Sequence, residues 1–464
     1  MTDTLPREAL DNVQRLPLVG FDTEHCLHLI LRVADAARAR AFLRVICDRN
    51  WVKNSASGPD SNHPLAGAGS LPTAMNIGFT FRGLEVIGLE GRYLSAFKAL
   101  APAFEQGARA RAAQIGDTGA SAAEYWEDRF ARGEAHVLVS LHADQQDLLY
   151  EAAVRLRGIS KDSLAGWEEP LHGKQLSSDP DGSGGKIRTT HFGFRDGVAR
   201  PTIKVDGESV TPNQEHYPAG ELFLGYSNGE GYDRWTETLS GDVAAFFRDC
   251  SFAAFRKIAQ DEETLDDFAQ KAAKRAGVNP DLLKAKMCGR WPNGAVLIPG
   301  ASTAPAQPPP ASDINRFDFR QDAEGHGCPY GAHIRRNNPR ADPVVHTRRR
   351  PLFRRGMPYG PKYTGVGDAQ PRGLLGLFFC ASLEDQFEHV MSEWVDKVPI
   401  RPGDRGDAKD PLAGNHDDLH AKFHIPRVGR PDIAIPGLTP FTTTLGGVYA
   451  FYPSMKALSL IAEG

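Results

Sequence analysis

The chain has 464 residues and a formal net charge of −4, from 54 lysines and arginines against 58 aspartates and glutamates. Hydrophobic residues make up 41% and charged residues 24%, a composition typical of soluble globular proteins, which excludes wholesale disorder, collagen and coiled coil. The near-neutral charge gives no general attraction to nucleic acid or to an anionic membrane. At about 150 residues per domain, the length predicts two to four domains, or two large ones.

Targeting and redox signals are weak. The longest apolar run, residues 374–383, is about half the length of the roughly 18 to 20 residues that a membrane span needs. The first residues, MTDTLPREALDNVQRL, contain no basic region followed by an apolar run, so we expect no secretory signal, no membrane partner and a cytoplasmic location. The six cysteines (Cys26, Cys47, Cys250, Cys288, Cys328 and Cys380) form no C-x-x-C pair, which predicts reduced thiols rather than disulfides or a zinc site.

Hydrophobic periodicity predicts the same pattern of elements in both halves of the chain. In the first half we expect strands at 25–33, 76–81 and 135–141 and helices at 34–49 and 145–156. In the second half we expect strands at 251–259, 374–381 and 444–452 and helices at 262–276 and 383–397. The last helix places Phe387, Val390, Met391 and Trp394 on one face.

The repeated pattern predicts an α+β fold of two similar domains, each an antiparallel sheet with helices on one side. The polar segment 207–218 contains the turn residues of a join, which divides the chain into residues 1–212 and 213–464. Three long irregular stretches, 176–190, 300–312 and 401–418, interrupt the pattern. Loops of this length often carry function.

The first of these stretches leads into residues 191–201, HFGFRDGVARP. Gly193 and Gly197 flank Asp196 in this string. Two glycines around an acid allow the backbone to approach another group closely. Taken alone, the string is more typical of an ordinary turn with an Asx hydrogen bond.

Residues 328–340, CPYGAHIRRNNPR, contain a lone histidine, His333, followed by Arg335 and Arg336. No second histidine stands at the helical spacing of a zinc site. Haem requires a single axial imidazole and cationic partners for its propionates, so this string fits haem better than zinc. A hydrogen-bonded structural histidine is the alternative.

Eight arginines lie between Arg335 and Arg355. Basic runs often bind phosphate, so nucleic-acid contact is the rival interpretation. Apolar residues interrupt the run, among them Pro351, Leu352 and Phe353. This interleaving and the acidic balance favour arginines held in a packed pocket, and we expect no nucleic-acid partner.

Together, these strings resemble the dye-decolourising (DyP-type) haem peroxidases. The resemblance runs from about Asn76 to the C-terminus and includes, in the family's order, NIGFTFRGLEVIGL, GFRDG, GELFLGYSN, CSFAAFRKIAQ, KMCGRWPNGAVL, CPYGAHIRRNNPR, FRRGMPYG, GLLGLFFCASLEDQFEHV and TLGGVYAFYPS. The long loops resemble those of the larger, highly active subgroup. The resemblance implies two ferredoxin-like domains, with one haem b per chain bound mainly by the C-terminal one.

The resemblance also implies three roles at the haem. His333 would be the axial ligand of the iron, Asp196 the distal acid and Arg354 the distal arginine. An axial imidazole usually donates its other N–H to a carboxylate, and the region near Val448 offers none. Gly356 stands where some relatives carry an asparagine.

Four further residues receive roles from the same resemblance. Leu377 and Phe379 would wall the distal pocket, and Arg336 would contact a propionate. Tyr359 would carry oxidising equivalents to the protein surface, or it packs under the distal loop.

The implied function is the reduction of hydrogen peroxide coupled to one-electron oxidation of phenols and bulky anthraquinone-type dyes. Asp196 and Arg354 would promote heterolytic O–O cleavage. A haem carrier with incidental peroxidase activity is the alternative, but a carrier has no need of both residues. The physiological reductant and any homo-oligomer stay open.

Overall fold

Two ferredoxin-like halves form the chain. The computed structural model describes residues 3–56, 71–178, 187–209, 215–307, 309–310, 313–342, 350–397, 408–416 and 418–464. The expected boundary between residues 212 and 213 lies outside these ranges.

The N-terminal half has the order strand, helix, strand, strand, helix, strand. These are β1 (His25–Val33), α2 (Ala36–Asp48), β2 (Ala74–Phe79), β3 (Val137–Ala143), α7 (Gln146–Ser160) and β5 (Leu171–Lys174). The strands lie in the order β2-β3-β1-β5, each antiparallel to its neighbour. Residues 25–33 form the expected strand, because its predominantly apolar residues are buried.

The C-terminal half repeats this topology. It consists of β10 (Ser251–Gln260), α10 (Glu262–Ala276), α11 (Pro280–Cys288), β11 (Phe353–Arg354), β12 (Met357–Tyr359), β13 (Gly373–Cys380), the helical segments η8 (Leu383–Glu388) and η9 (Val390–Val395), and β16 (Thr442–Tyr452). β13 pairs with β11 and β12 on one side and with β10 on the other, and β10 also pairs with β16. The expected helix at 262–276 has the predicted bounds, with the side chain of Asp261 accepting from Thr264 N at its start and Gly277 in the left-handed region at its end.

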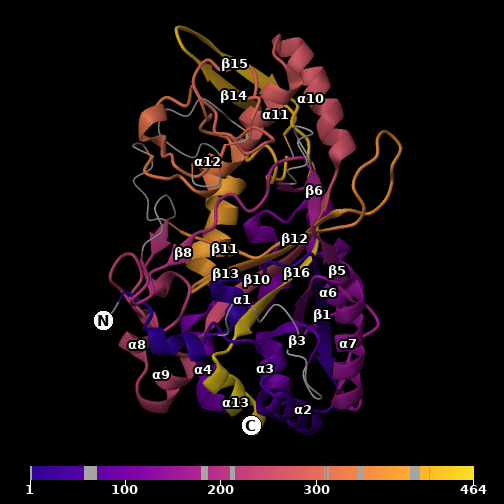
Figure 1. Ribbon diagram of the computed structural model, residues 1–464, viewed down its shortest axis with the longest axis vertical. Coiled ribbons are helices and arrows are strands. Elements are labelled where there is room, and N and C mark those ends of the chain that lie inside the picture. Colours follow the sequence, from indigo (N-terminus) through magenta and orange to yellow (C-terminus); the bar gives the residue numbers. More distant parts are fainter. Residues whose placement is uncertain are drawn as a thin grey trace.

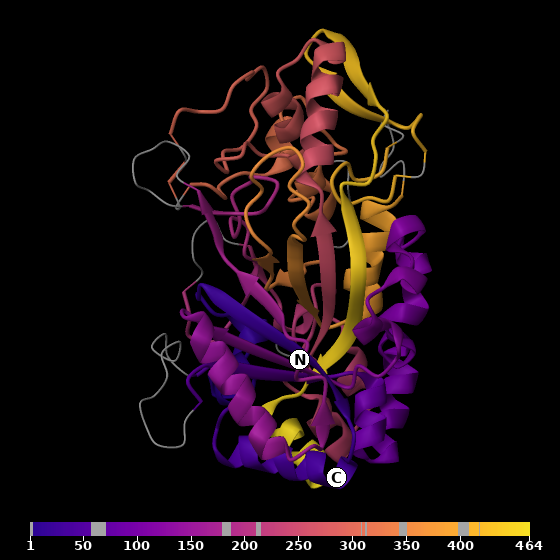
Figure 2. The ribbon, with the colours of Figure 1, turned by 90° about the vertical axis from the view of Figure 1, so that its right-hand side faces the viewer.

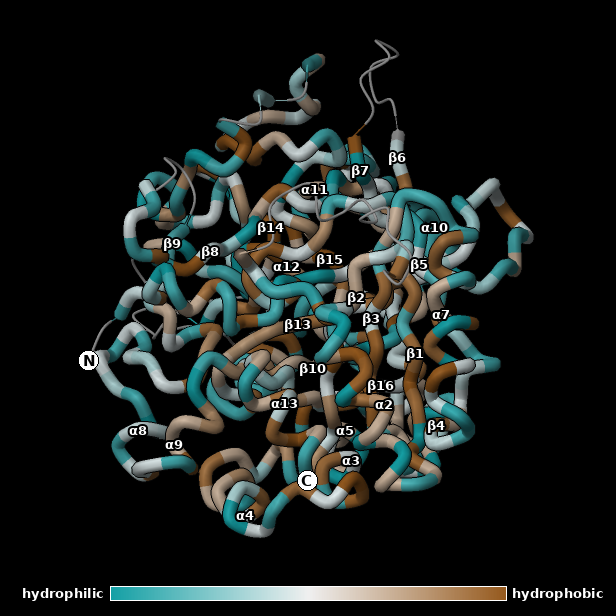
Figure 3. The backbone as a smooth tube through the Cα atoms, turned by 60° about the horizontal axis from the view of Figure 1, so that its bottom comes forward, coloured by the Kyte–Doolittle hydropathy of each residue, from teal (hydrophilic) through white to brown (hydrophobic). Residues whose placement is uncertain are grey.

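The two sheets are continuous. β16 pairs with β2 at Phe451 and Phe79, and β5 lies beside β12. The fourth strand of each half therefore adjoins the second strand of the other, and the strands wrap into a barrel with helices outside (Figures 1 and 2). The apolar residues concentrate on these strands (Figure 3).

The remaining elements connect or cover the barrel. The other helices are α1 (Arg15–Leu18), α3 (Phe81–Ile87), α4 (Gly91–Leu100), α5 (Pro102–Arg111), α6 (Asp128–Ala131), α8 (Arg234–Thr238), α9 (Gly241–Phe247), α12 (His333–Asn337) and α13 (Met455–Glu463). The 3-10 turns are η1 (Arg7–Asp11), η3 (Ala113–Ile115), η4 (Gly119–Ser121), η5 (Ala123–Tyr125), η6 (Ala219–Glu221) and η7 (Phe319–Asp322). The short strands are β4 (Leu164–Ala165), β6 (Leu176–Ser178), β7 (Ile187–Thr189), β8 (Thr202–Ile203), β9 (His216–Tyr217), β14 (Lys422–Arg427) and β15 (Arg430–Pro436).

The expected helix at 383–397 exists with a different winding. Residues 383–388 and 390–395 are π-helical, and Asp396 N donates to Met391 O, five residues earlier. All six cysteines are unpaired, and five of them are buried. In the described part of the chain, every helix is too short or too polar to cross a bilayer.

Candidate active site

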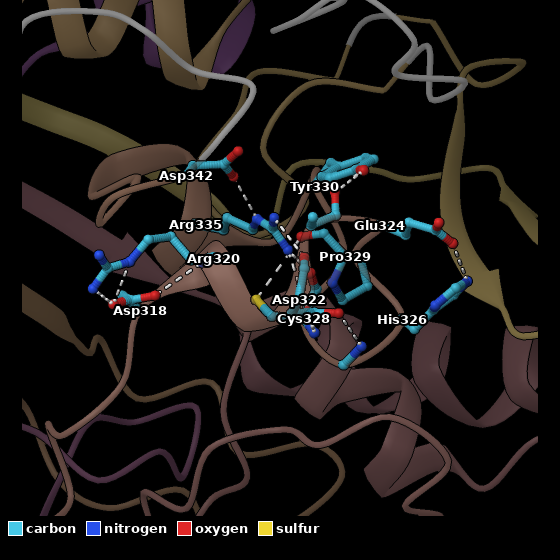
Figure 4. A network of polar contacts seen from close by, with 12 residues as sticks. Asp318, Arg320, Asp322, Glu324, His326, Cys328, Pro329, Tyr330, Arg335 and Asp342 are labelled. Carbon is cyan, nitrogen blue, oxygen red and sulfur yellow. Dashed lines mark hydrogen bonds and ion pairs between the residues drawn. The ribbon is translucent and has the colours of Figure 1, made fainter.

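His333 is the first residue of α12, a short helix fixed by the arginine that follows it. The Arg335 guanidinium is buried and donates to Asp342 Oδ2 (2.9 Å), Cys328 O (2.7 Å) and Asp322 O (2.9 Å). Figure 4 shows these groups converging on Arg335 from both sides of the helix. The network holds the loop before α12 and so fixes where His333 starts the helix.

A buried carboxylate orients the His333 imidazole. Nδ1 lies 2.8 Å from Asp410 Oδ2, which also accepts from Asn337 Nδ2 (3.0 Å). Asp410 Oδ1 accepts from the backbone N–H groups of Leu412 and Ala413. Burial raises the pKa of Asp410, but its interaction with His333 and these hydrogen bonds outweigh burial and lower the pKa to about 2. Nδ1 is thus engaged by an ionised carboxylate, which leaves Nε2 as the atom able to ligate a metal.

Sequence analysis missed Asp410. It looked for an acid near Val448, whereas the acid lies 77 residues beyond His333. The one available signal was the long irregular stretch 401–418, of which the structure describes 408–416 and 418.

The glycine-flanked turn presents Asp196 as expected. Gly193 and Gly197 have φ of 79° and 69°, in the left-handed region that favours glycine. Asp196 N donates to Arg188 O (2.8 Å), and Asp196 Oδ1 accepts from Gly197 N (2.7 Å). Oδ2 lies outside this turn hydrogen bond and is the carboxylate oxygen that can face a ligand.

His191 connects this turn to β12. Its Nε2 lies 2.8 Å from Tyr359 O, and its Nδ1 lies 3.2 Å from Glu262 Oε1. The side chain of His191 is fully buried. The acid-bearing turn is therefore anchored beside the strands that follow Arg354.

Arg354, the last residue of β11, and the adjacent Arg355 have different environments. Arg355 donates to the carbonyl oxygens of Leu16 (2.9 Å), Pro17 (2.8 Å) and Leu18 (2.7 Å) in α1. Burial lowers its pKa to about 9, and the charges of Arg200 and Arg354 add to this effect. The side chain of Arg354 is exposed, and within the described part of the chain its guanidinium has no ion-pair partner. The structure therefore leaves the first arginine of the pair free to act.

The strand register places the expected wall residues Leu377 and Phe379 on the opposite face of β13 from Arg354. Arg354 lies directly opposite Phe378 on β13, so the two side chains share a face of the sheet, together with Gly376. Leu377 and Phe379 lie on the other face: Leu377 is opposite Phe255 in the barrel core. The residue between the predicted pair, Phe378, is therefore the one that shares a face with Arg354. A Cβ at Gly376 would lie 2.7 Å from the Phe378 ring, so glycine lets that ring lie close to the sheet.

Arg336 does not point at a ligand. Its guanidinium donates to the backbone oxygens of Gly331 (3.2 Å), Trp394 (2.8 Å), Lys397 (3.1 Å) and Ala408 (2.7 Å). It joins α12 to η9 and to the segment that carries Asp410. The expected contact of Arg336 with a propionate stays a prediction.

Tyr359 is buried rather than at the surface. Its ring belongs to the main core, with the Lys257 ammonium 5.2 Å from the ring centroid. Burial raises the pKa of its hydroxyl. Of the two interpretations of Tyr359, packing describes its environment, and direct contact with a dye at this side chain is ruled out by its burial.

The structure brings the histidine and the acid together through a shared core. Phe194 of the Asp196 turn and Ile334 of α12 pack in one cluster with Leu412, next to Asp410. Arg200, which follows the turn, lies near Arg355. The turn that carries Asp196 and the helix that begins at His333 therefore contribute to one hydrophobic cluster.

Comparison with known proteins agrees with this architecture. Residues 12–170 match the family described as "DyP dimeric alpha+beta barrel domain". Dye-decolorizing peroxidase msp1 of Mycetinis scorodonius is 26% identical over 498 aligned positions, covering 97% of this chain and 87% of the relative. Nearly the whole chain is thus similar to dye-decolourising peroxidases. The multifunctional dye peroxidase DyP2 of Amycolatopsis is also 26% identical, with 97% of this chain and 95% of the relative covered.

Solved structures of dye-decolourising peroxidases share the fold. A fungal enzyme from Auricularia auricula-judae superposes with a TM-score of 0.77 at 24% identity, covering 98% of this chain and 99% of that one. A dye-decolorizing peroxidase in complex with 2,6-dimethoxyphenol gives 0.78 at 24% identity, with the same coverage. The predicted family, the α+β fold with two ferredoxin-like domains and the enzyme class are confirmed.

Members of the dye-decolourising peroxidase family are haem proteins, and the residues of this chain fit that group. An imidazole whose Nδ1 is held by a buried carboxylate has one nitrogen left for iron. Arg354 adds a cation that has no ion-pair partner among the described residues, and Asp196 adds a carboxylate. These residues would supply an iron ligand to a bound haem, and a carboxylate and a cation to its peroxide substrate.

Proposed function

We propose that the protein is a haem b peroxidase that reduces hydrogen peroxide and oxidises phenols and anthraquinone-type dyes in one-electron steps. The observation that carries the proposal is the His333–Asp410 pair, to which the exposed Arg354 and the turn residue Asp196 add a cation and a carboxylate. A protein that only carries haem would need the His333–Asp410 pair but neither Arg354 nor Asp196. The bound haem would supply an iron that reduces peroxide and stores the oxidising equivalents.

His333 would hold the iron through Nε2. Asp410 keeps the proton on Nδ1 and fixes the plane of the ring. Its negative charge raises the electron density of the imidazole, which favours the higher oxidation states that peroxide chemistry needs.

Asp196 would move the proton of the peroxide. As a carboxylate it takes the proton from the oxygen that approaches the iron, and it returns the proton to the oxygen that leaves as water. The hydrogen bond from Gly197 N to Oδ1 keeps the side chain in the turn and leaves Oδ2 for this transfer.

Arg354 would stabilise the negative charge that develops as the O–O bond breaks. An arginine stays protonated at working pH, and one without an ion-pair partner retains its full charge for the substrate. Phe378, on the same face of the sheet, would wall the pocket in place of Leu377 and Phe379.

Bulky dyes would be oxidised through the protein, by aromatic side chains that can carry a transient radical. Tyr359 would serve as an internal relay residue, since its ring is buried. Trp394 is a second candidate: its carbonyl oxygen accepts from Arg336 of α12, three residues after His333. Its ring packs against His389, with centroids 5.6 Å apart.

Stopped-flow mixing with peroxide tests the proposed roles. We expect Asp196→Asn and Arg354→Leu to slow the first change of the haem absorption band by at least about tenfold, the usual cost of losing a proton-transfer or charge-stabilising group. Asp147→Asn, on an exposed position of α7, is the matched control and should react like the wild type. Wild-type rates in both site variants would remove these residues from the mechanism.

A further inference from the structure

A cavity of about 210 Å³ lies apart from the groups described above. It is enclosed by the end of α4, the segment 220–228, α8 and the first turn of η8, with Phe252 of β10 at its base. In Figure 1, α4 and α8 lie at the lower end of the barrel, away from α12. Nothing in the proposed peroxide chemistry uses this cavity.

The walls of the cavity suit an aromatic ring. Tyr226, Tyr232 and Trp235 line it together with Phe223 and Phe252. Trp235 is 5% exposed, whereas Tyr232 is 45% exposed and therefore marks the opening. The Trp235 ring packs on Phe247 and Phe252, with centroids 4.5 and 6.0 Å away.

The size and charge of the cavity select the occupant. An apolar cavity of about 150 Å³ holds benzene, and drug-sized ligands need about 300 Å³ or more. A volume of 210 Å³ therefore accepts one substituted ring and excludes a three-ring anthraquinone. The charged lining residues are Asp233, Glu384, Asp385 and Arg234, and Arg234 Nη1 donates to Leu100 O. The excess of carboxylates disfavours sulfonated, anionic dyes and leaves neutral phenols acceptable.

The cavity adjoins the sheet face that carries Arg354. Phe252 lies opposite Cys380 on β13, and Cys380 is two residues beyond Phe378, so both are on that face. Ala381, which lines the cavity, is three residues beyond Phe378, or about 10 Å along an extended strand. Trp235 therefore lines a cavity that lies next to this face of the sheet.

We propose that this cavity is a docking site for single-ring phenols, which are oxidised through Trp235. The inference rests on the proposed peroxidase function. The peroxide reaction removes an electron from the indole, and the docked phenol replaces that electron and releases its proton to solvent at the mouth beside Tyr232. Two phenols supply two electrons and two protons, which convert one hydrogen peroxide into two waters and leave two phenoxyl radicals.

Two variants separate docking from electron transfer. Trp235→Phe keeps a ring against Phe247 and Phe252 but removes the oxidisable indole. Tyr232→Ala removes a largely exposed ring from the opening. Tyr125→Ala, at a 65% exposed tyrosine that does not line the cavity, is the matched control.

Binding is measured first, with 2-methoxyphenol and the haem-loaded enzyme without peroxide, by ligand-observed NMR titration. We expect Tyr232→Ala to weaken binding about three- to tenfold, as the loss of an aromatic contact does, and Tyr125→Ala to leave it unchanged. Wild-type affinity in Tyr232→Ala would overturn the docking site.

Steady-state turnover is measured next. We expect Trp235→Phe to lower kcat for 2-methoxyphenol by at least about fivefold with little change in KM, because it removes a step after binding. The rate of the peroxide reaction and the turnover of a sulfonated anthraquinone dye should match the wild type. Unchanged phenol kcat, or a slowed peroxide reaction, would overturn the relay through Trp235.

The two proposals fail in different ways. A wild-type enzyme that does not react with peroxide contradicts the peroxidase function itself. A wild-type enzyme that reacts with peroxide and oxidises the phenol, alongside variants that behave identically, contradicts only the cavity.

Discussion

The neighbouring residues Arg354 and Arg355 carry the same charge but have opposite roles in the structure. Arg355 binds three carbonyl oxygens of α1, while Arg354 is exposed. We expect Arg355→Leu to lower the free energy of unfolding by about 3 kcal/mol, since hydrogen bonds from a charged donor are lost in a buried place. Arg354→Leu should change stability by less than about 0.5 kcal/mol.

Urea unfolding of both variants, together with their rates of reaction with peroxide, checks this division. We expect Arg355→Leu to lose stability, and Arg354→Leu to keep its stability but react more slowly with peroxide. Equal stability losses would show that Arg354 is also a structural residue.

Single residues also show where sequence reasoning succeeds. His333 and Asp196 could be singled out because each stands in a distinctive string, and glycine at positive φ explains the turn around Asp196. Asp410 could not, because it approaches His333 only after 77 residues of chain have folded back. Arg336 looked like a ligand contact because charge is visible in sequence, whereas its four backbone acceptors are not.

At the scale of elements, the register of β13 decides which side chains face the proposed pocket. Phe379 is fully buried in the barrel core and its ring packs on Tyr452, with centroids 4.8 Å apart. Phe378 is partly exposed on the face of Arg354. A shift of one residue exchanges these faces, so predicting the strand at 374–381 does not by itself decide which of its side chains wall the pocket.

Alanine variants of these adjacent phenylalanines test the register. We expect Phe379→Ala to lower the free energy of unfolding by about 3 to 5 kcal/mol, the usual cost of truncating a buried ring. Phe378→Ala should cost less and should shift the haem absorption band of the loaded enzyme, because the ring would wall the pocket. Thermal unfolding and a visible spectrum measure both effects, and a spectral shift confined to Phe379→Ala would support the opposite register.

The π-helical segments η8 and η9 show a second limit of periodicity. The apolar residues 387, 390, 391 and 394 have the spacing of an α-helix. The buried polar side chains set the winding instead: Gln386 binds the backbone of Glu221 and Pro351, and Glu388 binds Arg111 and Tyr449. These partners come from distant parts of the chain and leave no local signal.

At the scale of the whole molecule, the internal repeat was visible as two series of strands and helices, and both ferredoxin-like halves follow it. Closure of the two sheets into one barrel was not visible, because it depends on pairing between β16 and β2 and on the approach of β5 to β12. The closed barrel encloses His28 and His142, whose rings lie 6.1 Å apart.

The enclosed histidines predict how stability depends on pH. Burial lowers the pKa of His28 to about 4 and that of His142 to about 3, and the charge of His28 adds to the second shift. Below about pH 6.5 the unfolded chain therefore binds more protons than the folded protein. As the pH is lowered, the free energy of unfolding decreases by up to about 1.4 kcal/mol per pH unit for each of the two histidines. Above that pH, these two groups add no pH dependence.

Urea unfolding between pH 7 and pH 5 checks this prediction. His142→Leu should show a shallower decline than the wild type, whatever its absolute stability, and His420→Gln, at an exposed position, should keep the wild-type slope. Parallel declines in the wild type and in His142→Leu would mean that His142 is protonated in the folded barrel.

The central claim is that this chain binds haem through His333 and uses it to reduce peroxide. The visible absorption spectrum of the purified, haem-loaded protein, recorded before and after one equivalent of hydrogen peroxide, tests the claim most directly. We predict a strong Soret band that shifts on addition of peroxide, and a His333→Ala variant that retains less haem and shows no shift. A wild-type protein without a haem band after loading, or a His333→Ala variant with full haem content and an unchanged spectrum, would contradict the account.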